Sequence, residues 1–365
     1  MNTGKKGGIE ESEMDKLNIL VEMGHPAHVH FFKNPIKIWE SLGHQVIIVT
    51  RDKEITHTLL DELGLKYTPL SKQKTGMLMM AGELMVRWAK MIYCIKANNI
   101  DVAISISGIS TSFPAWVCGI KAITCTDTED AVLSNKIAFK YSDVVLTPST
   151  FVNKSEFPNI QSYESFHELA YLHPNWYHPA RENLALFNIE EGERYIFMRL
   201  VQWKALHDIH EKGISEENLQ KIIDILTSQG YRVVISSERD LAPEFDRFLL
   251  TGPRSKVFDL MAFSQGFIGE SPTMAVETAI LGKPAVLINS RVNVLGNMIE
   301  LGNKYGVLFN FVNFEAAAEF IQHDFHSEEL RRHVQAGQQR LLADKIDISD
   351  YLAKFTIDFC QKKSD

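Results

Sequence analysis

The stretch GFIGESPTMAVETAILGKPAVLI, residues 266–288, carries the clearest run of local structural signals in the chain. An apolar strand ends at Gly269, and a small polar turn leads into a helix. Pro272 suits the first helical turn, where its missing N–H would have no partner in any case. Gly282 ends the helix and a second apolar strand follows. The stretch therefore predicts a strand–turn–helix–strand unit of a parallel α/β sheet.

The turn of this unit has the composition of an anion site. Backbone N–H groups at Thr273 and Met274, together with the hydroxyls of Ser271 and Thr273, lie where a helix begins and its first amides lack partners. Glu277 follows about one helical turn later, where a carboxylate could accept both hydroxyls of a ribose. An ordinary capped helix with a solvated Glu277 has the same pattern, so this segment alone leaves both interpretations open.

Strands alternate with helices on both sides of the unit. The predicted strands are 16–23, 44–52, 65–70, 101–108, 121–129, 142–149, 194–200, 231–238, 265–270, 283–289 and 305–311. The predicted helices are 27–42, 54–63, 77–97, 216–229, 259–264, 273–281, 294–304, 327–344 and 349–361. Val- and Ile-rich strands between helices indicate parallel sheets covered on both faces.

The alternation breaks once, in FHELAYLHPNWYHPARENLALFNIEEGE, which contains two prolines and little periodicity. We therefore expect two Rossmann-like, doubly wound α/β domains that face a cleft. The expected division is a lead-in at 1–16, a first domain at 17–170, a linker at 171–193, a second domain at 194–345, and a C-terminal helix at 346–365 that packs back on the first domain. Ligands of such folds bind outside the carboxyl ends of the strands, which puts the site in the cleft.

Composition narrows the classes of function. The chain has 365 residues, 45% of them hydrophobic and 23% charged, with a formal net charge of -8. This balance argues against nucleic acid as a partner. No apolar run reaches the length that spans a bilayer, the first 16 residues lack the apolar core of a signal peptide, and the four cysteines are scattered. We expect a cytoplasmic protein.

Three histidines gather in MGHPAHVHFF, residues 23–32. On a helix that starts at Pro26, His28 and His30 would lie roughly 200° apart and could not share one metal ion. An extended segment would turn them the same way, but the chain lacks the further ligands of that kind of site. We therefore predict no metal site. His25 and His28 are expected to line the cleft, one of them as a general base, while His30 belongs to the core.

The segment TDTED supplies carboxylates to the same edge of the first domain. Asp127, Glu129 and Asp130 follow a predicted strand, so at least one of them should reach the cleft. Asp127 and Glu129 are the acidic candidates for catalysis, with Glu129 the main rival of the histidines for the role of base.

The predicted helix at 77–97 is rich in methionine and has basic residues nearby. It could touch a membrane surface and reach a lipid-linked acceptor. We favour the plainer interpretation, a core-facing amphipathic helix with a cationic outer face.

Several motifs together resemble known families. GESPTMAVETAILGKPAV resembles the donor-binding segment of glycosyltransferase-B folds and of non-hydrolysing nucleotide-sugar 2-epimerases. GHPAHVHFFKN, TDTED, ELAYLHPN and VQWKALHD, in this order, resemble the domain of unknown function 354 family of that superfamily, from Leu17 to about Asp350.

The resemblance implies roles for individual residues. The turn formed by Glu270, Ser271, Thr273 and Met274 would hold a diphosphate, and Glu277 a ribose. Arg199, at a strand end, could pair with the diphosphate, with Lys204, His207 and Asp208 close by, although VQWKALHD also fits a packed Trp203 and a capping Asp208. Ser237, between Ser236 and Glu238, ends the next strand and would approach the base. Glu129 resembles the catalytic glutamate of the epimerase motif HVEAG, but its flanking residues differ and the epimerase motif HRREN is absent.

The function implied is transfer of a sugar from a nucleotide-diphosphate sugar, with UDP the favoured nucleotide, to a glycan or lipid-linked acceptor in surface polysaccharide synthesis. The nucleotide sugar is a co-substrate, and no resident cofactor is implied. A nucleotide-sugar 2-epimerase and a non-catalytic nucleotide-sugar-binding protein are the alternatives. Peripheral contact with the inner face of the membrane and homo-oligomerisation stay open.

Overall fold

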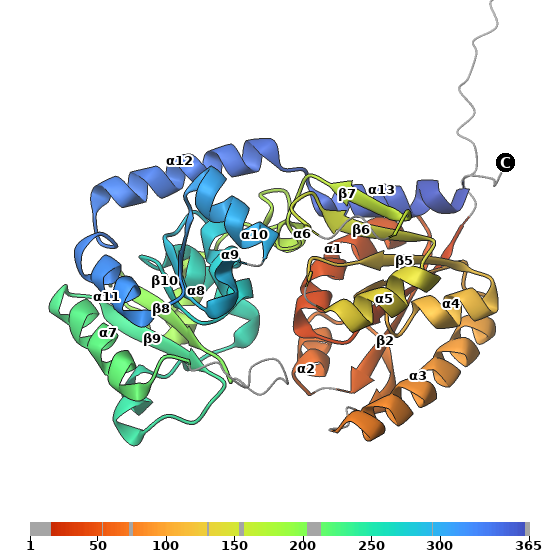
Figure 1. Cartoon of the computed structure of the whole chain (residues 1–365), viewed down its shortest axis with the longest axis horizontal. Helices are drawn as coiled ribbons and strands as arrows, with labels where there is room; N and C mark the ends of the chain where they lie inside the picture. The colour runs from red at the N-terminus through yellow and green to blue at the C-terminus, as the bar shows by residue number, and fades with distance from the viewer. Residues whose placement is uncertain are drawn as a thin grey trace, which may run out of the picture.

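The first half of the chain folds around a parallel sheet whose strands bury both faces. The computed structural model describes residues 16–52, 54–72, 76–129, 131–152, 157–202, 213–293 and 295–361. Its first sheet has seven strands in the order β3-β2-β1-β4-β5-β6-β7 (Figure 1). They are β1 Asn18–Met23, β2 Gln45–Asp52, β3 Tyr67–Lys72, β4 Val102–Ile106, β5 Lys121–Cys125, β6 Val144–Pro148 and β7 Ile160–Tyr163. Ile19 of β1 pairs with Val46 of β2 and Val102 of β4, so β1 lies inside the sheet with a strand on each side.

Helices cover both faces of this sheet. Successive side chains of β1 point to opposite faces, and both sets include apolar residues, so each face packs against helices. Ile19 and Val21 join the cluster that contains Phe31 of α1, whereas Leu20 joins Met91 of α3. The helices are α1 Pro26–Ser41, α2 Glu54–Glu62, α3 Met77–Ala97, α4 Ser112–Cys118 and α5 Val132–Tyr141.

The second half repeats this plan around a five-stranded parallel sheet in the order β12-β11-β10-β8-β9. Its strands are β8 Tyr195–Leu200, β9 Arg232–Ser237, β10 Phe267–Gly269, β11 Ala285–Ile288 and β12 Leu308–Phe311. Its helices are α7 Glu216–Ser228, α8 Val257–Phe263, α9 Pro272–Ile280, α10 Gly296–Glu300, α11 Phe314–His323 and α12 Glu328–Asp344. Ile196 faces α7 and α11, and Phe197 faces α8 and α9.

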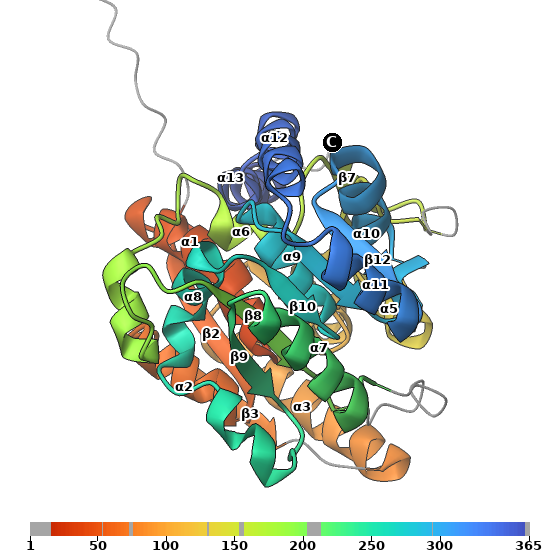
Figure 2. The same ribbon diagram turned by 90° about the vertical axis from the view of Figure 1, so that its left-hand side faces the viewer.

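Two segments join the domains. After β7 the chain forms α6 (Leu169–Leu172) and the 3-10 helix Arg181–Phe187. After α12 it returns as α13 (Ile348–Gln361), where Trp39 Nε1 of α1 donates to the carbonyl of Ala353 at 3.2 Å. In Figure 2 the second domain lies in front of the first, with α12 and α13 along the top of both.

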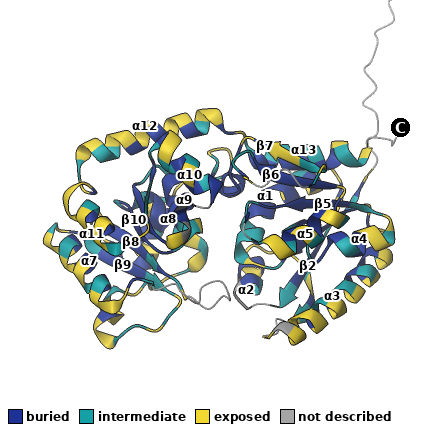
Figure 3. Cartoon of the chain, in the orientation of Figure 1, coloured by how far each residue is buried: buried dark blue, intermediate teal, exposed yellow. Residues whose placement is uncertain are grey.

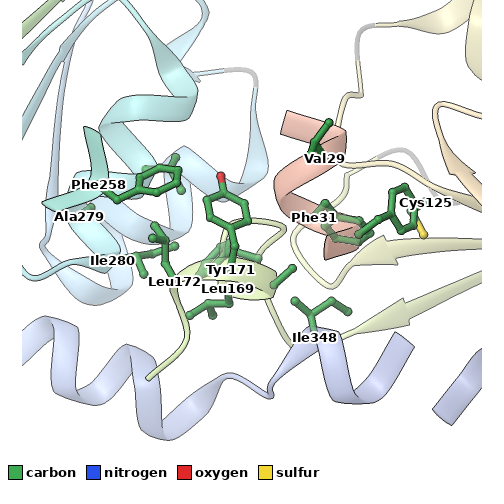
Figure 4. Packing of buried hydrophobic residues seen from close by; sticks show 14 of the residues in the cluster. Val29, Phe31, Cys125, Leu169, Tyr171, Leu172, Phe258, Ala279, Ile280 and Ile348 are labelled. Carbon is green, nitrogen blue, oxygen red and sulfur yellow. The ribbon is translucent and has the colours of Figure 1, made fainter. Parts of the chain in front are cut away.

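A buried lysine fastens this return. Lys345 Nζ lies 2.9 Å from Glu300 Oε2 of the second domain and 3.4 Å from Glu164 Oε2, just after β7. One apolar cluster also runs from α1 and α6 into α8 and α9, and Figure 4 shows part of it around Tyr171 and Phe258. The two domains therefore share a continuous core.

The architecture confirms the predicted fold of two Rossmann-like α/β domains with parallel sheets. Strand β7 and helix α11 were not predicted, and the segment predicted as an irregular linker contains helical turns. Among the described residues, no helix is long and apolar enough to span a bilayer.

Candidate functional site

The β10–α9 turn has the predicted local structure. Ser271 caps α9, its Oγ accepting from the N–H of Met274 at 3.4 Å, and Pro272 occupies the first turn. The Met274 amide is therefore engaged by Ser271, which differs from the free amide that we predicted. Gly269 is required just before the turn, because a side chain there would collide with the backbone of Arg199 in β8.

Glu277 is buried rather than solvated. Only 5% of its surface is exposed, and the hydroxyl of Tyr171, from α6, donates to Oε1 at 2.7 Å. Burial raises the pKa of Glu277 to about 7, while the Tyr171 hydrogen bond, Arg199 and Lys33 act in the opposite direction. The site thus holds a carboxyl group that changes charge near neutral pH.

The first domain contributes Lys33 and His30 of α1 to the same place. Lys33 Nζ lies 5.8 Å from the centre of the Tyr171 ring, and burial lowers the pKa of Lys33 to about 8. The His30 ring lies 5.2 Å from the Tyr171 ring and 4.9 Å from that of Phe258 in α8, measured between centroids. Burial lowers the pKa of His30 to about 3, and its buried Nδ1 has no hydrogen-bond partner among the described residues. His30 is therefore a neutral interdomain packing residue.

Arg199 lies next to the last residue of β8, in the second domain. Its Nη1 donates to Ser236 Oγ at 2.6 Å, its Nη2 forms an ion pair with Glu238, and its side chain is 17% exposed. The guanidinium is held in place and is also near enough to act on the charge of Glu277. A cation, a carboxyl group and the start of α9 therefore come together on this domain.

Two other residues that we predicted to contact the nucleotide form hydrogen bonds within the protein instead. Glu270 is fully buried, and its carboxylate accepts from the amides of Val201 and Ile214, so the structure does not support its direct contact with a nucleotide. Ser237 Oγ donates to the carbonyl of Arg239 at 2.6 Å, in a turn that ends β9. Five further residues named in the sequence analysis lie outside the described part of the chain: Asp130, Trp203, Lys204, His207 and Asp208.

The predicted acids of the first domain lie where it meets the second. Glu129 is 8% exposed, and its Oε1 accepts from the amide of Gly296 in α10 at 3.2 Å. Burial raises the pKa of Glu129, and Oε2 is buried without a partner among the described residues. Asp127 Oδ2 lies 3.4 Å from Nδ1 of the buried His167. Both acids are close to the interdomain surface, and one oxygen of Glu129 is unused.

Sequence reasoning assigned no role to three groups at this site. Glu168 is 5% exposed, burial raises its pKa well above the ordinary range, and its Oε2 lacks a partner among the described residues. Asp127 and Glu277 both act on its charge, which places Glu168 between the acids of the two domains. The motif ELAYLHPN, which contains Glu168 and Tyr171, was the available signal, and Lys33 lies within GHPAHVHFFKN.

Backbone amides hold the two histidines before and within α1. His25 Nδ1 accepts from the amide of Ala27 at 3.2 Å, and His28 Nδ1 accepts from the amide of Gly24 at 3.3 Å. A neutral imidazole whose Nδ1 accepts a hydrogen bond carries its proton on Nε2. This tautomer does not suit the general-base role that we predicted for His25 or His28, because Nε2 already carries a proton. Among the residues that the structure describes, no group of three or more potential ligands is arranged for a metal ion.

Solved structures share this fold at low sequence identity. A UDP complex of MnaA from S. aureus matches with a TM-score of 0.69 and 11% identity, covering 96% of this chain and 98% of that one. UDP-GlcNAc 2-epimerase from Neisseria meningitidis, bound to UDP-GlcNAc, gives 0.66 and 10%, covering 95% and 100%. A glycosyltransferase from Rickettsia africae gives 0.61 and 15%, covering 96% and 100%. The glycosyltransferase-B-like fold is therefore confirmed.

Sequence comparison gives the family. An uncharacterized protein of Methanocaldococcus jannaschii is 25% identical over 290 residues, which cover 75% of this chain and 82% of that protein. The family described as "Protein of unknown function (DUF354)" matches residues 17–297. The chain therefore belongs to this family.

Proposed function

We propose that the protein is a glycosyltransferase that takes its sugar from a nucleotide-diphosphate donor, with UDP as the nucleotide. The observation that carries the proposal is the group formed by Arg199, Glu277 and the N-terminus of α9 at the carboxyl ends of β8 and β10. Burial of Glu277 raises its pKa to about 7 and lowers the stability of the folded protein at neutral pH. A role in ligand binding would explain why a carboxyl group is kept at this position.

In this proposal the donor diphosphate lies at the start of α9, against the hydroxyls of Ser271 and Thr273. Arg199 and the positive end of the helix dipole offset the negative charge that develops on the leaving diphosphate. Glu277 accepts hydrogen bonds from the ribose, in exchange for the one that it now receives from Tyr171.

Glu129 is the proposed general base. It would take the proton of the acceptor hydroxyl as the sugar C1–O bond to the diphosphate breaks. Burial raises the pKa of Glu129, which makes the carboxylate a stronger base, and its Oε2 has no partner among the described residues. Asp127, backed by His167, is the alternative base. We propose a glycan or lipid-linked acceptor in surface polysaccharide synthesis, and action in the cytoplasm.

A 2-epimerase is the second candidate because two buried acids with raised pKa values, Glu129 and Glu168, lie near the domain interface. Such acids could remove and return the proton at C2 of the sugar without any acceptor. The missing HRREN motif argues against this alternative.

The test is incubation of the protein with UDP-GlcNAc in D2O, followed by proton NMR and chromatography of the nucleotide. A transferase releases UDP in the presence of a suitable acceptor and leaves C2 undeuterated. An epimerase incorporates deuterium at C2 of the donor alone, which would overturn the transferase assignment. Binding without either reaction would indicate a nucleotide-sugar-binding protein.

A further inference from the structure

Helix α3 turns apolar side chains to the solvent. At 100° per residue, Leu78, Met85, Val86 and Tyr93 fall within an arc of about 100°. Their exposed fractions are 90%, 61%, 52% and 75%. Figure 3 shows exposed residues along the outer side of this helix. The outer face, which we expected from the sequence to be cationic, therefore also carries a stripe of apolar side chains.

The buried side of α3 holds an ion pair. Glu83 and Arg87 are each 7% exposed and lie 3.1 Å apart, between Oε2 of the one and Nη2 of the other. Arg51 of β2 also reaches Glu83 Oε2 at 2.8 Å. Glu83 is the only acidic residue of α3, and its charge is fully engaged beneath the helix. The outer face therefore has no carboxylate of its own.

Basic and aromatic residues border the apolar stripe. Lys90 and Lys96 are exposed on α3. The neighbouring helix α4 exposes 61% of Trp116, which lies in a group of rings with Phe113 and Tyr141. The outer face of α3 thus combines apolar side chains with two exposed lysines, in a chain of formal net charge -8.

We propose that the outer face of α3, with Trp116 of α4, docks on the surface of an anionic lipid bilayer. An apolar centre enters the acyl boundary, lysines reach anionic headgroups, and tryptophan and tyrosine prefer that boundary. A symmetric contact between two copies of the chain is the alternative occupant, and the oligomeric state tests it.

The docking does not depend on the reaction. If the proposed transferase activity is correct, docking places the site next to the membrane, and the acceptor is the lipid-linked class. Vesicle binding and turnover of UDP-GlcNAc are separate measurements, so either proposal can fail alone.

The experiment is flotation of the full chain with vesicles of phosphatidylglycerol and phosphatidylcholine in equal parts, beside vesicles of phosphatidylcholine alone. We expect binding that is strongest on the anionic vesicles and weakens with salt. The double variant Leu78→Glu, Met85→Glu should lower the partition at least about tenfold, and Lys90→Glu with Lys96→Glu should abolish the preference for anionic vesicles.

Leu186→Glu is the matched control, because Leu186 is 49% exposed in the segment between the domains and away from α3. It should bind as the wild type does. Circular dichroism and light scattering of each variant check folding and oligomeric state. No flotation of the wild type, an equal loss in Leu186→Glu, or a wild-type dimer that Leu78→Glu separates would each overturn the proposal.

Discussion

Glu277→Gln tests the central acid of the site in two opposite ways. The ordinary pKa of a glutamate is 4.5, and in the folded protein that of Glu277 is about 7. The difference corresponds to about 3 kcal/mol, since one pH unit is worth about 1.36 kcal/mol. Glutamine keeps the shape and an oxygen for the Tyr171 hydroxyl, but it has no charge to bury.

The sign of the pH dependence follows from the raised pKa. Below pH 4.5 the carboxyl is protonated in both the folded and the unfolded chain. As the pH rises from about 4.5 to about 7, the unfolded chain releases this proton first, so the wild type loses up to about 3 kcal/mol of unfolding free energy. We expect Glu277→Gln to match the wild type at pH 4 and to be more stable by up to that amount at pH 8.

Urea unfolding over this pH range measures the difference between the two proteins. Glu62→Gln, at the exposed end of α2, is the control and should follow the wild type at every pH. A parallel loss of stability in wild type and Glu277→Gln would refute the buried, high-pKa carboxyl. At pH 4, where the carboxyl group is neutral in both states, Glu277→Ala should instead cost about 1–3 kcal/mol, because it leaves the Tyr171 hydroxyl buried without its acceptor.

Glu277→Gln should also bind nucleotide less well than the wild type. Loss of a charged hydrogen-bond acceptor for the ribose should weaken UDP binding by about 1–3 kcal/mol in calorimetry. A protein that becomes more stable while it loses affinity is the signature of a residue retained for binding. Unchanged affinity for UDP would remove Glu277 from the proposed site.

Four further outcomes follow from the same geometry. A UDP-sugar at 100 times its dissociation constant should stabilise the protein by about 2.7 kcal/mol in a thermal-shift assay, and no response to any nucleoside-diphosphate sugar would refute the donor assignment. Glu129→Gln should lower turnover by about 10²–10⁴-fold and leave donor affinity nearly unchanged, whereas normal turnover would exclude Glu129 as the base. His30→Ala should lower stability through lost packing against Tyr171 and Phe258, which thermal unfolding checks. His25→Ala and His28→Ala should raise KM more than they lower kcat if they donate hydrogen bonds, and a loss confined to kcat would restore the general-base interpretation.

The sequence predicted the elements that are buried and strongly patterned. The strand–turn–helix unit around Pro272 formed as expected, because the apolar strand, the cap and the helix-ending glycine all favour the same structure. Strand β7 escaped prediction because it lies at the edge of its sheet, where Gln161 and Ser162 are exposed and the apolar signal is weak. Helix α11 escaped although Asn313 caps it, so in that case the signal was present and was not used.

The site was predictable in position and not in electrostatics. The sequence places Glu277 after a strand end, but its burial depends on Tyr171, which lies 106 residues earlier in the chain. The apolar stripe on the outer face of α3 was missed for the same reason. Its buried side is defined by Arg51 on a different strand, and helical periodicity alone cannot tell which stripe of a helix faces the protein.

The histidines show why the tautomer matters more than the motif. Three of them in six residues suggest metal binding or base catalysis, since imidazole serves both. In the structure the backbone amides of Gly24 and Ala27 occupy Nδ1 of His28 and His25, while His30 is turned into the interface. A neutral ring held in this way carries its proton on Nε2 and has no second lone pair to accept another. We therefore propose an acid as the proton acceptor, with Glu129 as the first candidate, because its Oε2 has no partner among the described residues and burial raises its pKa.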